Sequence, residues 1–522
     1  MLYGRELNMR WVDWLAEGRV GRWPAAVVVA AVYCVAQVVI MPLASWLAGT
    51  GVSHDDAEQL MYMPYLWLGY GGSQPPLYSW LGWAVASVVG PNILALKILK
   101  YALIFASLAT VHATVRWLGH SARAAAAAMF GLLLFPQIFW EMQRQLSHSI
   151  AALLFSALLV AALFAVLRRG STLAYLVLGL VAALAVLSKF NNLLLLAALL
   201  AAAASMRATR PAVKSPKLAI SAAVALAALA PTIYWSATHT ASVMSRSYKF
   251  GMDAETNAVM TALTGTLQLA NAAMNFAILP VIVIVAALGF ARLMPRGPAA
   301  DTTESLLWRT MEFGMALTLV LVLASGTTRL SDRWLLPVLF LLPMTMAIRL
   351  DAFGAKGRTA QGVMIGVGAV LALGAMPVSW FVQVRAGDGL SRVVQMQYGD
   401  LHRSLTRDGA VRTFVSDWHW VGNLRLVDPV AVVLNDEVPA FTSLIEEPAM
   451  LVWLDSDVPK QRHLDALARG GFAPAGDYQF VTAPEFLSEG GRRVGFVRLS
   501  KAETSSQPEA TGASPPELIP QP

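Results

Sequence analysis

Long apolar runs separated by short polar segments dominate the chain from residue 25 to residue 382. The runs at 149–167 and 171–188, for example, contain no charged residue. A helix needs about 20 apolar residues to cross roughly 30 Å of hydrocarbon, so these runs predict membrane-spanning helices. Eleven spans are predicted, at approximately 25–47, 95–115, 124–140, 149–167, 171–188, 190–206, 218–236, 271–291, 310–327, 334–348 and 362–382.

A further apolar segment, 75–90, is shorter and begins with Pro75-Pro76. It is too short to span the bilayer comfortably, so we expect an interfacial or re-entrant helix in the first external loop. If it did span, the orientation of every later loop would be inverted.

The distribution of Lys and Arg sets the orientation of the spans. Arg5, Arg10, Arg19 and Arg22 precede the first span, whereas the loop 49–76 contains neither Lys nor Arg. Because basic residues concentrate in cytoplasmic segments, the N-terminus is predicted to be cytoplasmic and this loop external. An odd number of spans then places the C-terminus outside as well.

The composition changes at about residue 385, where charged residues return. Short β-rich runs alternate there with a helical stretch around 460–470, which predicts a small external α/β domain over 385–501. The predicted strands are 411–415, 431–434, 450–454 and 493–499. Residues 1–384 form the predicted membrane domain, and the tail 502–522, rich in Ser, Pro and Glu, is expected to be disordered.

Composition excludes several classes of protein. Of the 522 residues 57% are hydrophobic and only 14% are charged, which rules out a purely soluble protein. The net charge of +7 is explained by basic cytoplasmic loops, so no nucleic-acid partner is predicted. The single cysteine, Cys34, excludes an intrachain disulfide and a cysteine metal cluster.

Ionisable residues gather at the predicted external ends of the helices, where they are costly unless they are solvated, paired or used. The set comprises Asp55, Asp56, Glu58, Glu141, Arg144, His148, Lys189, Arg246, Lys249, Arg329, Asp332 and Arg333. This pattern predicts a polar cavity that opens outward. Adjacent Asp55 and Asp56 could supply a general base, and nearby aromatic residues could stack on a sugar ring. The alternative is a solvated acidic loop that ends in a Pro-Pro turn.

No cofactor is required by these residues. Asp55, Glu58 and His148 are of the right type to bind a divalent metal, but their spacing is not diagnostic of a metal site.

Five motifs, with Gly69-Tyr70 and the stretch from Gln74 taken as one, resemble in their order those of integral-membrane glycosyltransferases of the protein O-mannosyltransferase and aminoarabinose transferase type. The resemblance covers roughly residues 25–350. The motifs are Asp55-Asp56-Ala57, Gly69-Tyr70, Gln74-Pro75-Pro76-Leu77-Tyr78-Ser79-Trp80, Pro136-Gln137-Ile138-Phe139-Trp140-Glu141 with Leu146-Ser147-His148-Ser149, Gly179-Leu180 with Leu187-Ser188-Lys189-Phe190-Asn191, and Arg333-Trp334-Leu335-Leu336-Pro337.

The resemblance implies a polytopic helical protein of the GT-C fold in the bacterial inner membrane. It also implies a monosaccharide donor carried on a polyprenyl phosphate such as undecaprenyl phosphate, and transfer with inversion on the periplasmic side. The acceptor stays open between lipid A or lipopolysaccharide, another envelope glycan, and protein.

The same resemblance implies roles for individual residues. Asp55 matches the family's catalytic acid and would deprotonate the acceptor hydroxyl, with Asp56 assisting or orienting it. Growing negative charge on the leaving phosphate needs stabilisation. The candidates for binding the donor are Gln74, Lys189, Arg246, Lys249, Arg333, His148, Tyr62 and Tyr70.

One departure from the family concerns Gln74, which stands where the aminoarabinose transferases have a lysine that contacts the donor phosphate. A neutral amide cannot supply that charge, so either another cation takes the role or the donor differs.

Structural alternatives remain for several of the other candidates. Lys189 could extend from a helix end to the membrane surface, and His148 could pair with Glu141. Arg246 and Lys249 could bind lipid headgroups, and Arg333 could pair with Asp332.

A transporter or flippase of a lipid-linked or anionic substrate is the alternative function. Such proteins commonly show internal repeats and ionisable groups near the middle of the bilayer. No repeat is evident here, and the spans between 149 and 206 are nearly free of ionisable residues in their interiors. Charged residues at the membrane boundary therefore favour a transferase.

Overall fold

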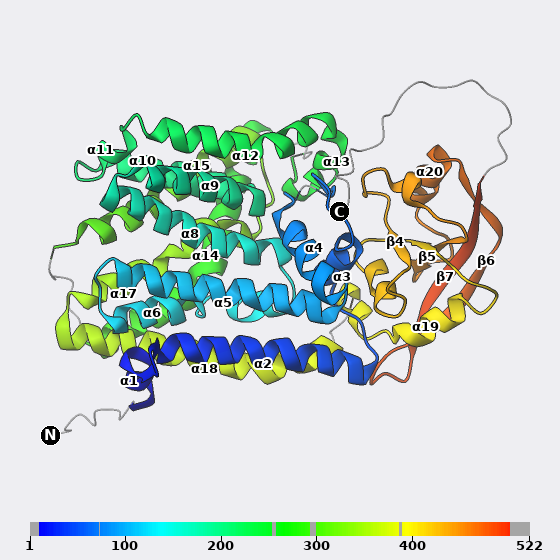
Figure 1. The fold of residues 1–522 in the computed structure, drawn as a ribbon, viewed down its shortest axis with the longest axis horizontal. Coiled ribbons are helices and arrows are strands. Elements are labelled where there is room, and N and C mark those ends of the chain that lie inside the picture. The colour runs from blue at the N-terminus through cyan, green and yellow to red at the C-terminus, as the bar shows by residue number, and fades with distance from the viewer. Residues whose placement is uncertain (1–9, 73, 253–256, 293–298, 386–388, 502–522) are drawn as a thin grey trace.

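The computed structural model describes residues 10–72, 74–252, 257–292, 299–385 and 389–501. It consists of a long helical bundle and a smaller sheet domain at one end of that bundle (Figure 1). The sheet domain is formed by the C-terminal part of the chain, coloured orange to red in the figure. The tail predicted to be disordered, 502–522, lies outside the described residues.

Apolar side chains drive the assembly of the bundle, whose core runs from Val12 to Ala372 along the chain. Its principal helices are α1 (Arg10–Glu17), α2 (Ala25–Ala48), α5 (Ile93–Trp117), α6 (Ala122–Leu132), α7 (Met142–Arg144), α8 (Ser147–Arg169), α9 (Thr172–Ser188), α10 (Asn192–Ser205), α11 (Arg210–Val213), α12 (Leu218–Thr238), α14 (Ala258–Phe290), α15 (Thr302–Ser325), α16 (Leu336–Leu339), α17 (Leu341–Asp351) and α18 (Gly354–Val384).

Each of the eleven predicted spans coincides with helix in the structure, which confirms a polytopic helical membrane protein. Among the described residues, eight helices are long and apolar enough to cross a membrane. The pair formed by α6 and the segment Gln137–Arg144 is apolar enough for a ninth crossing but is bent by 69°, as in a broken span or a re-entrant loop. The two remaining predicted spans correspond to α9 and α10, which are apolar but shorter.

The helix predicted at 75–90 is α4 (Leu77–Val89), only 13 residues long. It begins directly after Pro75-Pro76 and lies beside α3 (His54–Tyr62) at the end of the bundle that faces the sheet domain (Figure 1). The first loop therefore folds into two short helices at the end of the longer ones, next to the sheet domain.

The C-terminal domain is built on a five-stranded sheet with strand order β4-β3-β5-β7-β6. Strand β3 pairs in parallel with β4 and β5, and β7 pairs antiparallel with β5 and β6. Its elements are α19 (Tyr398–Leu405), β3 (Thr413–Val415), β4 (Val432–Leu434), β5 (Ala449–Leu454), α20 (Gln461–Arg469), β6 (Phe472–Pro484) and β7 (Gly491–Lys501).

The four predicted strands and the predicted helix all appear, but β6 was missed. Its residues are mostly exposed, and it contains Pro474, Gly476 and Asp477, which strand patterns avoid. It lies at the edge of the sheet, where proline is tolerated.

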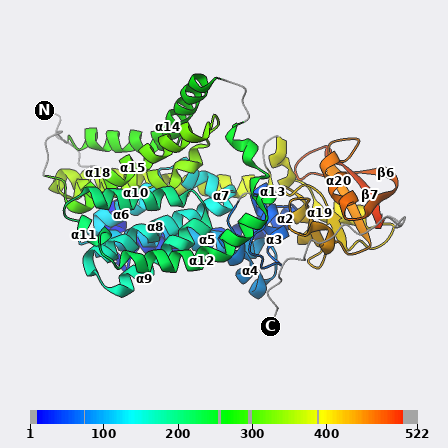
Figure 2. The ribbon, with the colours of Figure 1, turned by 90° about the horizontal axis from the view of Figure 1, so that it is seen from above.

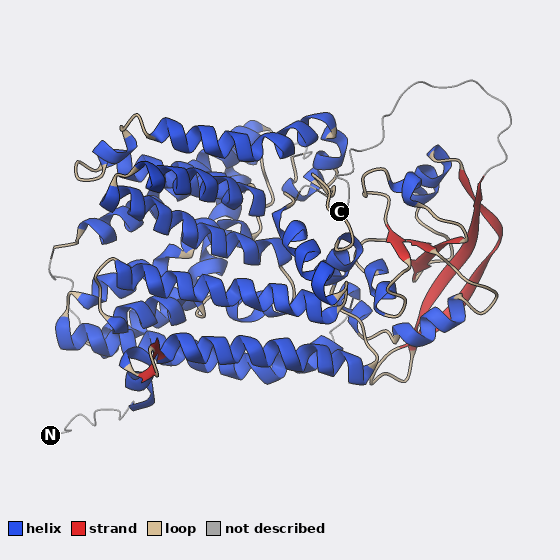
Figure 3. Cartoon of the chain, viewed as in Figure 1, coloured by secondary structure: helices blue, strands red, loops and turns tan. Residues whose placement is uncertain are grey.

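Short elements complete the chain. These are β1 (Arg19–Val20), β2 (Trp23–Pro24), α13 (Thr240–Met244), a π-helical turn η1 (Gln137–Glu141), and 3-10 turns η2 (Ser247–Phe250), η3 (Asp332–Leu335), η4 (Gly389–Val394), η5 (Val421–Leu426) and η6 (Phe441–Leu444). Figure 3 shows that the strands lie in the C-terminal domain, apart from the small β1–β2 hairpin at the opposite end of the bundle.

The two ends of the bundle differ in what they carry. Helices α3, α4 and α13 lie at the end next to the C-terminal domain, and α1 and α11 lie at the other end (Figure 1). The view from above shows the same separation (Figure 2). The first loop and the C-terminal domain thus share one side of the bundle, in agreement with the charge distribution.

The orientation can be tested by cysteine labelling in a variant whose own Cys34 is replaced by Ala. Asp457 in the C-terminal domain has an 82% exposed side chain, and exposed Lys214 lies at the far end of the bundle. An impermeant maleimide added to spheroplasts should label Asp457→Cys, whereas Lys214→Cys should require permeabilisation. The reverse pattern would contradict the orientation.

Candidate active site

Helix α3 turns its acidic residues in different directions, because consecutive helical residues do not share a face. The helix is nine residues long and begins at His54 after Ser53. Asp55 lies toward an open side, whereas Asp56 points into the bundle. Glu58 points toward the C-terminal domain, where its partner Arg246 is also held.

Asp56 is fully buried and is bound by two lysines of α5. Its Oδ2 lies 3.0 Å from Lys97 Nζ and its Oδ1 lies 3.0 Å from Lys100 Nζ, and all three side chains are 0% exposed. Burial raises the pKa of Asp56, but the charges of Lys100 and Lys97 outweigh burial and hold that pKa below its ordinary value. Both Asp56 oxygens therefore lie against lysines inside the bundle, and the assisting role that the family resemblance implies for Asp56 stays a prediction.

The same network reaches two further helices. Lys97 Nζ also donates to Gln383 Oε1 at 3.1 Å, and Gln383 Nε2 donates to Ser45 Oγ at 3.1 Å. Helix α3 is thereby tied to α5, α18 and α2. Lys97 and Lys100 are not among the site residues predicted from the sequence, although two lysines three residues apart at the start of an apolar helix indicate a buried acidic partner.

Asp55 is held in place by its neighbours but stays accessible, with 25% of its side chain exposed. Its Oδ2 accepts a hydrogen bond of 2.8 Å from the Leu146 amide, and His54 Nε2 lies 3.5 Å from its Oδ1. Burial raises the pKa of Asp55, but His54, Arg333 and the Leu146 amide outweigh it, so the pKa lies below its ordinary value. Asp55 is therefore ionised and able to accept a proton.

Leu146 adopts an uncommon backbone conformation, with φ of 71° just before α8. A left-handed leucine is strained, and such strain is found where the surrounding structure holds a functional group. Here it directs the Leu146 amide at the Asp55 carboxylate.

Lys189, Lys249 and Arg333 are among the cations on this side of the bundle that have no carboxylate partner among the described residues. Lys189 Nζ donates to Ser149 Oγ at 2.8 Å. Burial and the charge of Arg333 lower the pKa of Lys189 to about 7, against the opposing effect of Asp55. Burial and Arg246 lower the pKa of Lys249. An anion bound beside these cations would reduce the repulsion between their positive charges.

Arg246 differs from these cations because two carboxylates neutralise it. Its Nη2 lies 2.8 Å from Glu58 Oε1 and 2.6 Å from Glu437 Oε2, and its guanidinium carbon lies 4.5 Å from the Trp418 ring centroid. Burial raises the pKa of Glu58 despite the opposing charge of Arg246. Since Glu437 and Trp418 follow β4 and β3, Arg246 joins α3 to the C-terminal domain.

Two glycines let the first loop approach Arg246 and Glu437 closely. Gly71 and Gly72 both have positive φ, 81° and 67°. A Cβ on Gly72 would lie 2.7 Å from the Arg246 guanidinium carbon, and one on Gly71 would lie 2.3 Å from the Glu437 carbonyl oxygen. Only glycine fits both the conformation and the space.

The aromatic candidates are packed inside. Tyr62 and Tyr70 are each 3% exposed, their ring centroids are 5.1 Å apart, and the Tyr70 hydroxyl donates to the Tyr65 carbonyl at 2.7 Å. They belong to a hydrophobic cluster shared with the C-terminal domain. This packing leaves little of either ring exposed for stacking on a sugar.

His148 lies at the start of α8, with its ring centroid 5.5 Å from that of Tyr78. Glu141, which the sequence offered as a partner for His148, instead accepts from Gln145 at 2.6 Å and lies 3.8 Å from Arg144. Asp55, Glu58 and His148 are not assembled as metal ligands: no group of three or more His, Cys, Asp or Glu side chains suitable for a metal occurs in the described part of the chain.

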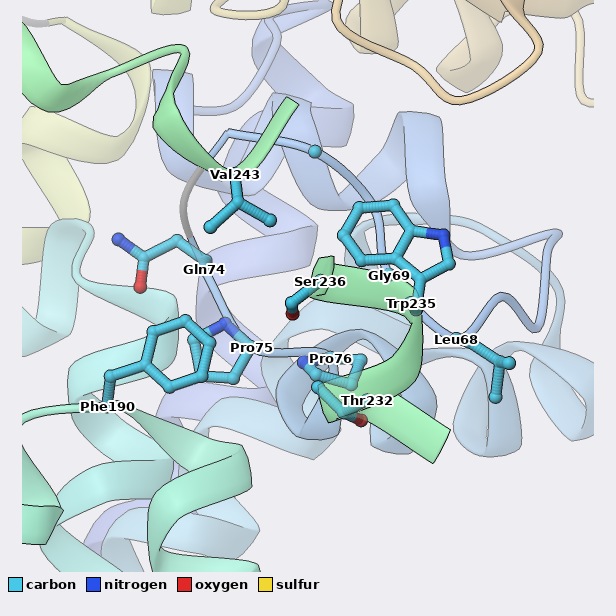
Figure 4. A pocket seen from close by; sticks show the side chains of 11 residues that line it. Leu68, Gly69, Gln74, Pro75, Pro76, Phe190, Thr232, Trp235, Ser236 and Val243 are labelled. Atoms are coloured by element: carbon cyan, nitrogen blue, oxygen red, sulfur yellow. The ribbon is translucent and has the colours of Figure 1, made fainter. Parts of the chain in front are cut away.

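Gln74 lines a pocket between the first loop and α12. Figure 4 shows Gln74 and Phe190 on one side of this pocket and Trp235 and Leu68 on the other. Since Lys189 directly precedes Phe190, Gln74 lies beside the part of the chain that carries this cation. The other lining residues are Gly69, Gly71, Pro75, Pro76, Thr232, Ser236 and Val243.

Comparison with known proteins identifies the family. Residues 73–235 match the dolichyl-phosphate-mannose-protein mannosyltransferase family. Over 406 residues the chain is 30% identical to the lipopolysaccharide core galacturonosyltransferase RgtB of Rhizobium johnstonii, covering 77% of this chain and 82% of the relative. The chain belongs to the superfamily of membrane glycosyltransferases that includes the protein O-mannosyltransferases and the aminoarabinose transferases. RgtA, a lipopolysaccharide core galacturonosyltransferase of the same organism, is 30% identical to this glycosyltransferase over 438 residues, covering 80% of this chain and 86% of the relative.

Among solved structures, ArnT from Cupriavidus metallidurans bound to undecaprenyl phosphate superposes with a TM-score of 0.52 at 13% identity, covering 92% of this chain and 99% of ArnT. This likeness confirms the GT-C fold expected from the sequence motifs.

The buried charge network predicts a large effect of Asp56 on stability. Asp56→Asn leaves Lys97 and Lys100 buried without a counter-charge, and we expect it to lower the free energy of unfolding by about 3–5 kcal/mol. Thermal unfolding of the purified glycosyltransferase in detergent measures this as a lower Tm.

The matched control removes all three charges together. Asp56→Leu combined with Lys97→Met and Lys100→Met should recover most of the lost stability, because apolar side chains can replace a buried ionic cluster at little cost. A Tm of Asp56→Asn equal to that of wild type would show that the network does not anchor α3.

Proposed function

We propose that this glycosyltransferase transfers a hexuronic acid, galacturonic acid in particular, from a polyprenyl phosphate to the core of lipopolysaccharide on the periplasmic side of the inner membrane. The names of RgtA and RgtB support the sugar and the acceptor. The undecaprenyl phosphate bound to ArnT, a protein of the same fold, supports the donor lipid.

The observation that carries this proposal is an ionised carboxylate beside cations that lack carboxylate partners. Asp55 is accessible, and its negative charge raises the pKa of Lys189 and of Lys249 against the effect of burial. The charge of Arg333 in turn lowers the pKa of Asp55. A base next to a site for a phosphate is what a displacement at a sugar phosphate requires.

The reaction is a single displacement. Asp55 takes the proton of the acceptor hydroxyl, and the hydroxyl oxygen forms the new bond to the anomeric carbon. The bond from that carbon to the phosphate oxygen breaks, and its electron pair leaves with the polyprenyl phosphate. Lys189, Lys249 and Arg333 stabilise the charge that grows there. Attack from the face opposite the leaving phosphate inverts the anomeric centre.

The charge of the site favours an acidic sugar. A polyprenyl-phosphate uronic acid brings two anionic groups, a phosphate and a carboxylate, to Lys189, Lys249 and Arg333, which have no carboxylate partner in the described part of the chain. An amino sugar carries a positive charge and would be repelled.

Asp55→Asn tests the base. The substitution preserves size but removes the proton acceptor, so kcat should fall by roughly 10²-fold or more, the scale of general-base loss, while donor affinity and Tm stay near wild type. The measurement is transfer of labelled hexuronic acid to purified lipopolysaccharide in vesicles. A kcat equal to that of wild type would remove Asp55 from the mechanism.

Gln74→Lys tests whether this position serves the donor phosphate. A lysine there should be tolerated, because it adds a cation next to an anion. It should also restore donor affinity to Lys249→Ala, which lacks one cation. The measurements are the donor affinity and turnover of Gln74→Lys, of Lys249→Ala and of the double variant. Additive losses in the double variant would show that Gln74 lies away from the phosphate.

A further inference from the structure

A large apolar cavity lies beside α1, at the end of the bundle opposite the sheet domain. Its volume is about 230 Å³. Helices α1, α2, α5, α6 and α18 line it, and α1 packs against α2, α6 and α18 at this end (Figure 1). Since α3 lies at the other end of the bundle, the cavity is separate from the candidate active site. Its lining includes Trp11 and Trp14 of α1, Ala30 and Tyr33 of α2, and Ala372 and Leu373 of α18.

The chemistry of the lining suits hydrocarbon. No residue that lines the cavity carries a charge, and its polar side-chain groups are the two indole N–H groups and the hydroxyl of Tyr33, which accepts a hydrogen bond of 3.1 Å from Gln37 Nε2. Protein interiors are usually packed as densely as organic crystals, so a cavity of this size is unusual. Apolar cavities of roughly 150 Å³ stay dry and bind small apolar molecules. We therefore expect an apolar ligand here rather than water.

The cavity is open to the surroundings of the bundle. Trp11, Trp14 and Leu373 line it and are each about half exposed. Tryptophan gathers at the boundary between the hydrocarbon and the lipid headgroups, and α1 lies at the ends of α2 and α18, where that boundary is expected. An acyl chain can therefore enter the cavity from the bilayer.

Helix α1 is a fixed wall of the cavity because ion pairs and apolar packing hold it. Asp13 Oδ1 lies 2.7 Å from Arg123 Nη1 at the start of α6, and Glu17 Oε1 lies 2.8 Å from Arg358 Nη2 of α18. Val12 is completely buried in the core of the bundle. Both acidic residues of α1 are thus neutralised by arginines of other helices.

The edge of this wall carries positive charge. Arg10, at the start of α1, and Arg19 and Arg22, in the β1–β2 hairpin that follows α1, are all exposed. None of the three forms an ion pair with a carboxylate in the part of the chain that the structure describes. Arg22 lies over the exposed ring of Trp23, 5.1 Å from its centroid. Basic side chains at the membrane surface attract anionic lipid headgroups.

We propose that this cavity binds one acyl chain of an anionic glycerophospholipid, whose headgroup phosphate is held by Arg10, Arg19 and Arg22. An apolar cavity with a basic edge matches a molecule with a hydrocarbon tail and an anionic head, whereas a zwitterionic lipid satisfies only the cavity. In the predicted orientation the lipid belongs to the cytoplasmic leaflet, on the side away from the reaction. It stabilises the packing of α1 against the bundle.

Thermal unfolding of the full-length protein in detergent tests the binding. A ligand that binds only the folded state raises the Tm. Dioleoyl phosphatidylglycerol should raise it by on the order of 3 °C, and dioleoyl phosphatidylcholine, which has the same acyl chains, should raise it less. Equal effects of the two lipids on the wild-type protein, or no effect of either, would overturn the proposal.

A larger side chain in the cavity tests the place where the acyl chain binds. Ala30 is 6% exposed and lines the cavity, whereas Val32 of the same helix is 64% exposed. Ala30→Phe should keep or raise the Tm without lipid, because the ring packs inside the cavity, but should lose the rise caused by phosphatidylglycerol. Val32→Phe, the matched control, should keep that rise. A full rise in Ala30→Phe would contradict the proposed place of binding.

Charge removal tests the headgroup site. Replacement of Arg10, Arg19 and Arg22 together by Gln should make the effects of phosphatidylglycerol and phosphatidylcholine equal. A control with the same change in net charge, which should keep the preference for phosphatidylglycerol, replaces three exposed basic residues around α11, at the same end of the bundle. These are Arg207, Lys214 and Lys217. A preference that survives in the first variant, or that is lost in the control, would show that the three arginines do not hold the headgroup.

Photo-crosslinking locates the lipid without any substitution. Phosphatidylglycerol with a diazirine in one acyl chain should label peptides from α1, α2 and α18 that line the cavity, and unlabelled phosphatidylglycerol should compete with it. Labelling confined to other helices would overturn the proposal. Competition by undecaprenyl phosphate at lower concentration than by phosphatidylglycerol would also overturn it, because the occupant would then be a polyprenyl chain.

Discussion

The placement of the candidate active site depends on one buried carboxylate and two lysines. Lys97 and Lys100 lie in an apolar helix where a charge without a partner is expensive, and Asp56 of α3 supplies the opposite charge to both. Binding Asp56 fixes the rotation of α3. Because neighbouring helical residues point in different directions, turning Asp56 inward turns Asp55 toward the open side. In the proposed mechanism, Asp56 therefore has a structural role and Asp55 a chemical one.

The C-terminal domain extends the same site from the other direction. Its parallel strands β3 and β4 end in loops that carry Trp418 and Glu437, and both residues contact Arg246. The carboxyl ends of parallel strands commonly line ligand sites, and here they close over the membrane part of the protein. Glycines at 71 and 72 let the first loop approach this contact closely. The domain is therefore part of the site's framework.

Much of the fold could be predicted because it follows from local patterns. Apolar runs identify the membrane helices, Pro75-Pro76 marks the start of α4, and four strands of the sheet follow from β-rich runs. The irregular edge strand β6 has no such pattern. The direction in which Asp56 points could not be predicted from its neighbours, because it depends on Lys97, 41 residues away. Likewise, Arg246 meets Glu437 across 191 positions, and no local signal connects them.

The proposed reaction places the donor phosphate beside Asp55, next to Lys189 and Arg333. A structure of the protein with a bound polyprenyl phosphate tests this arrangement most directly. The account predicts the phosphate within hydrogen-bonding distance of Lys189 and Arg333. A phosphate bound at Arg144 instead, or no phosphate near Asp55, would contradict it.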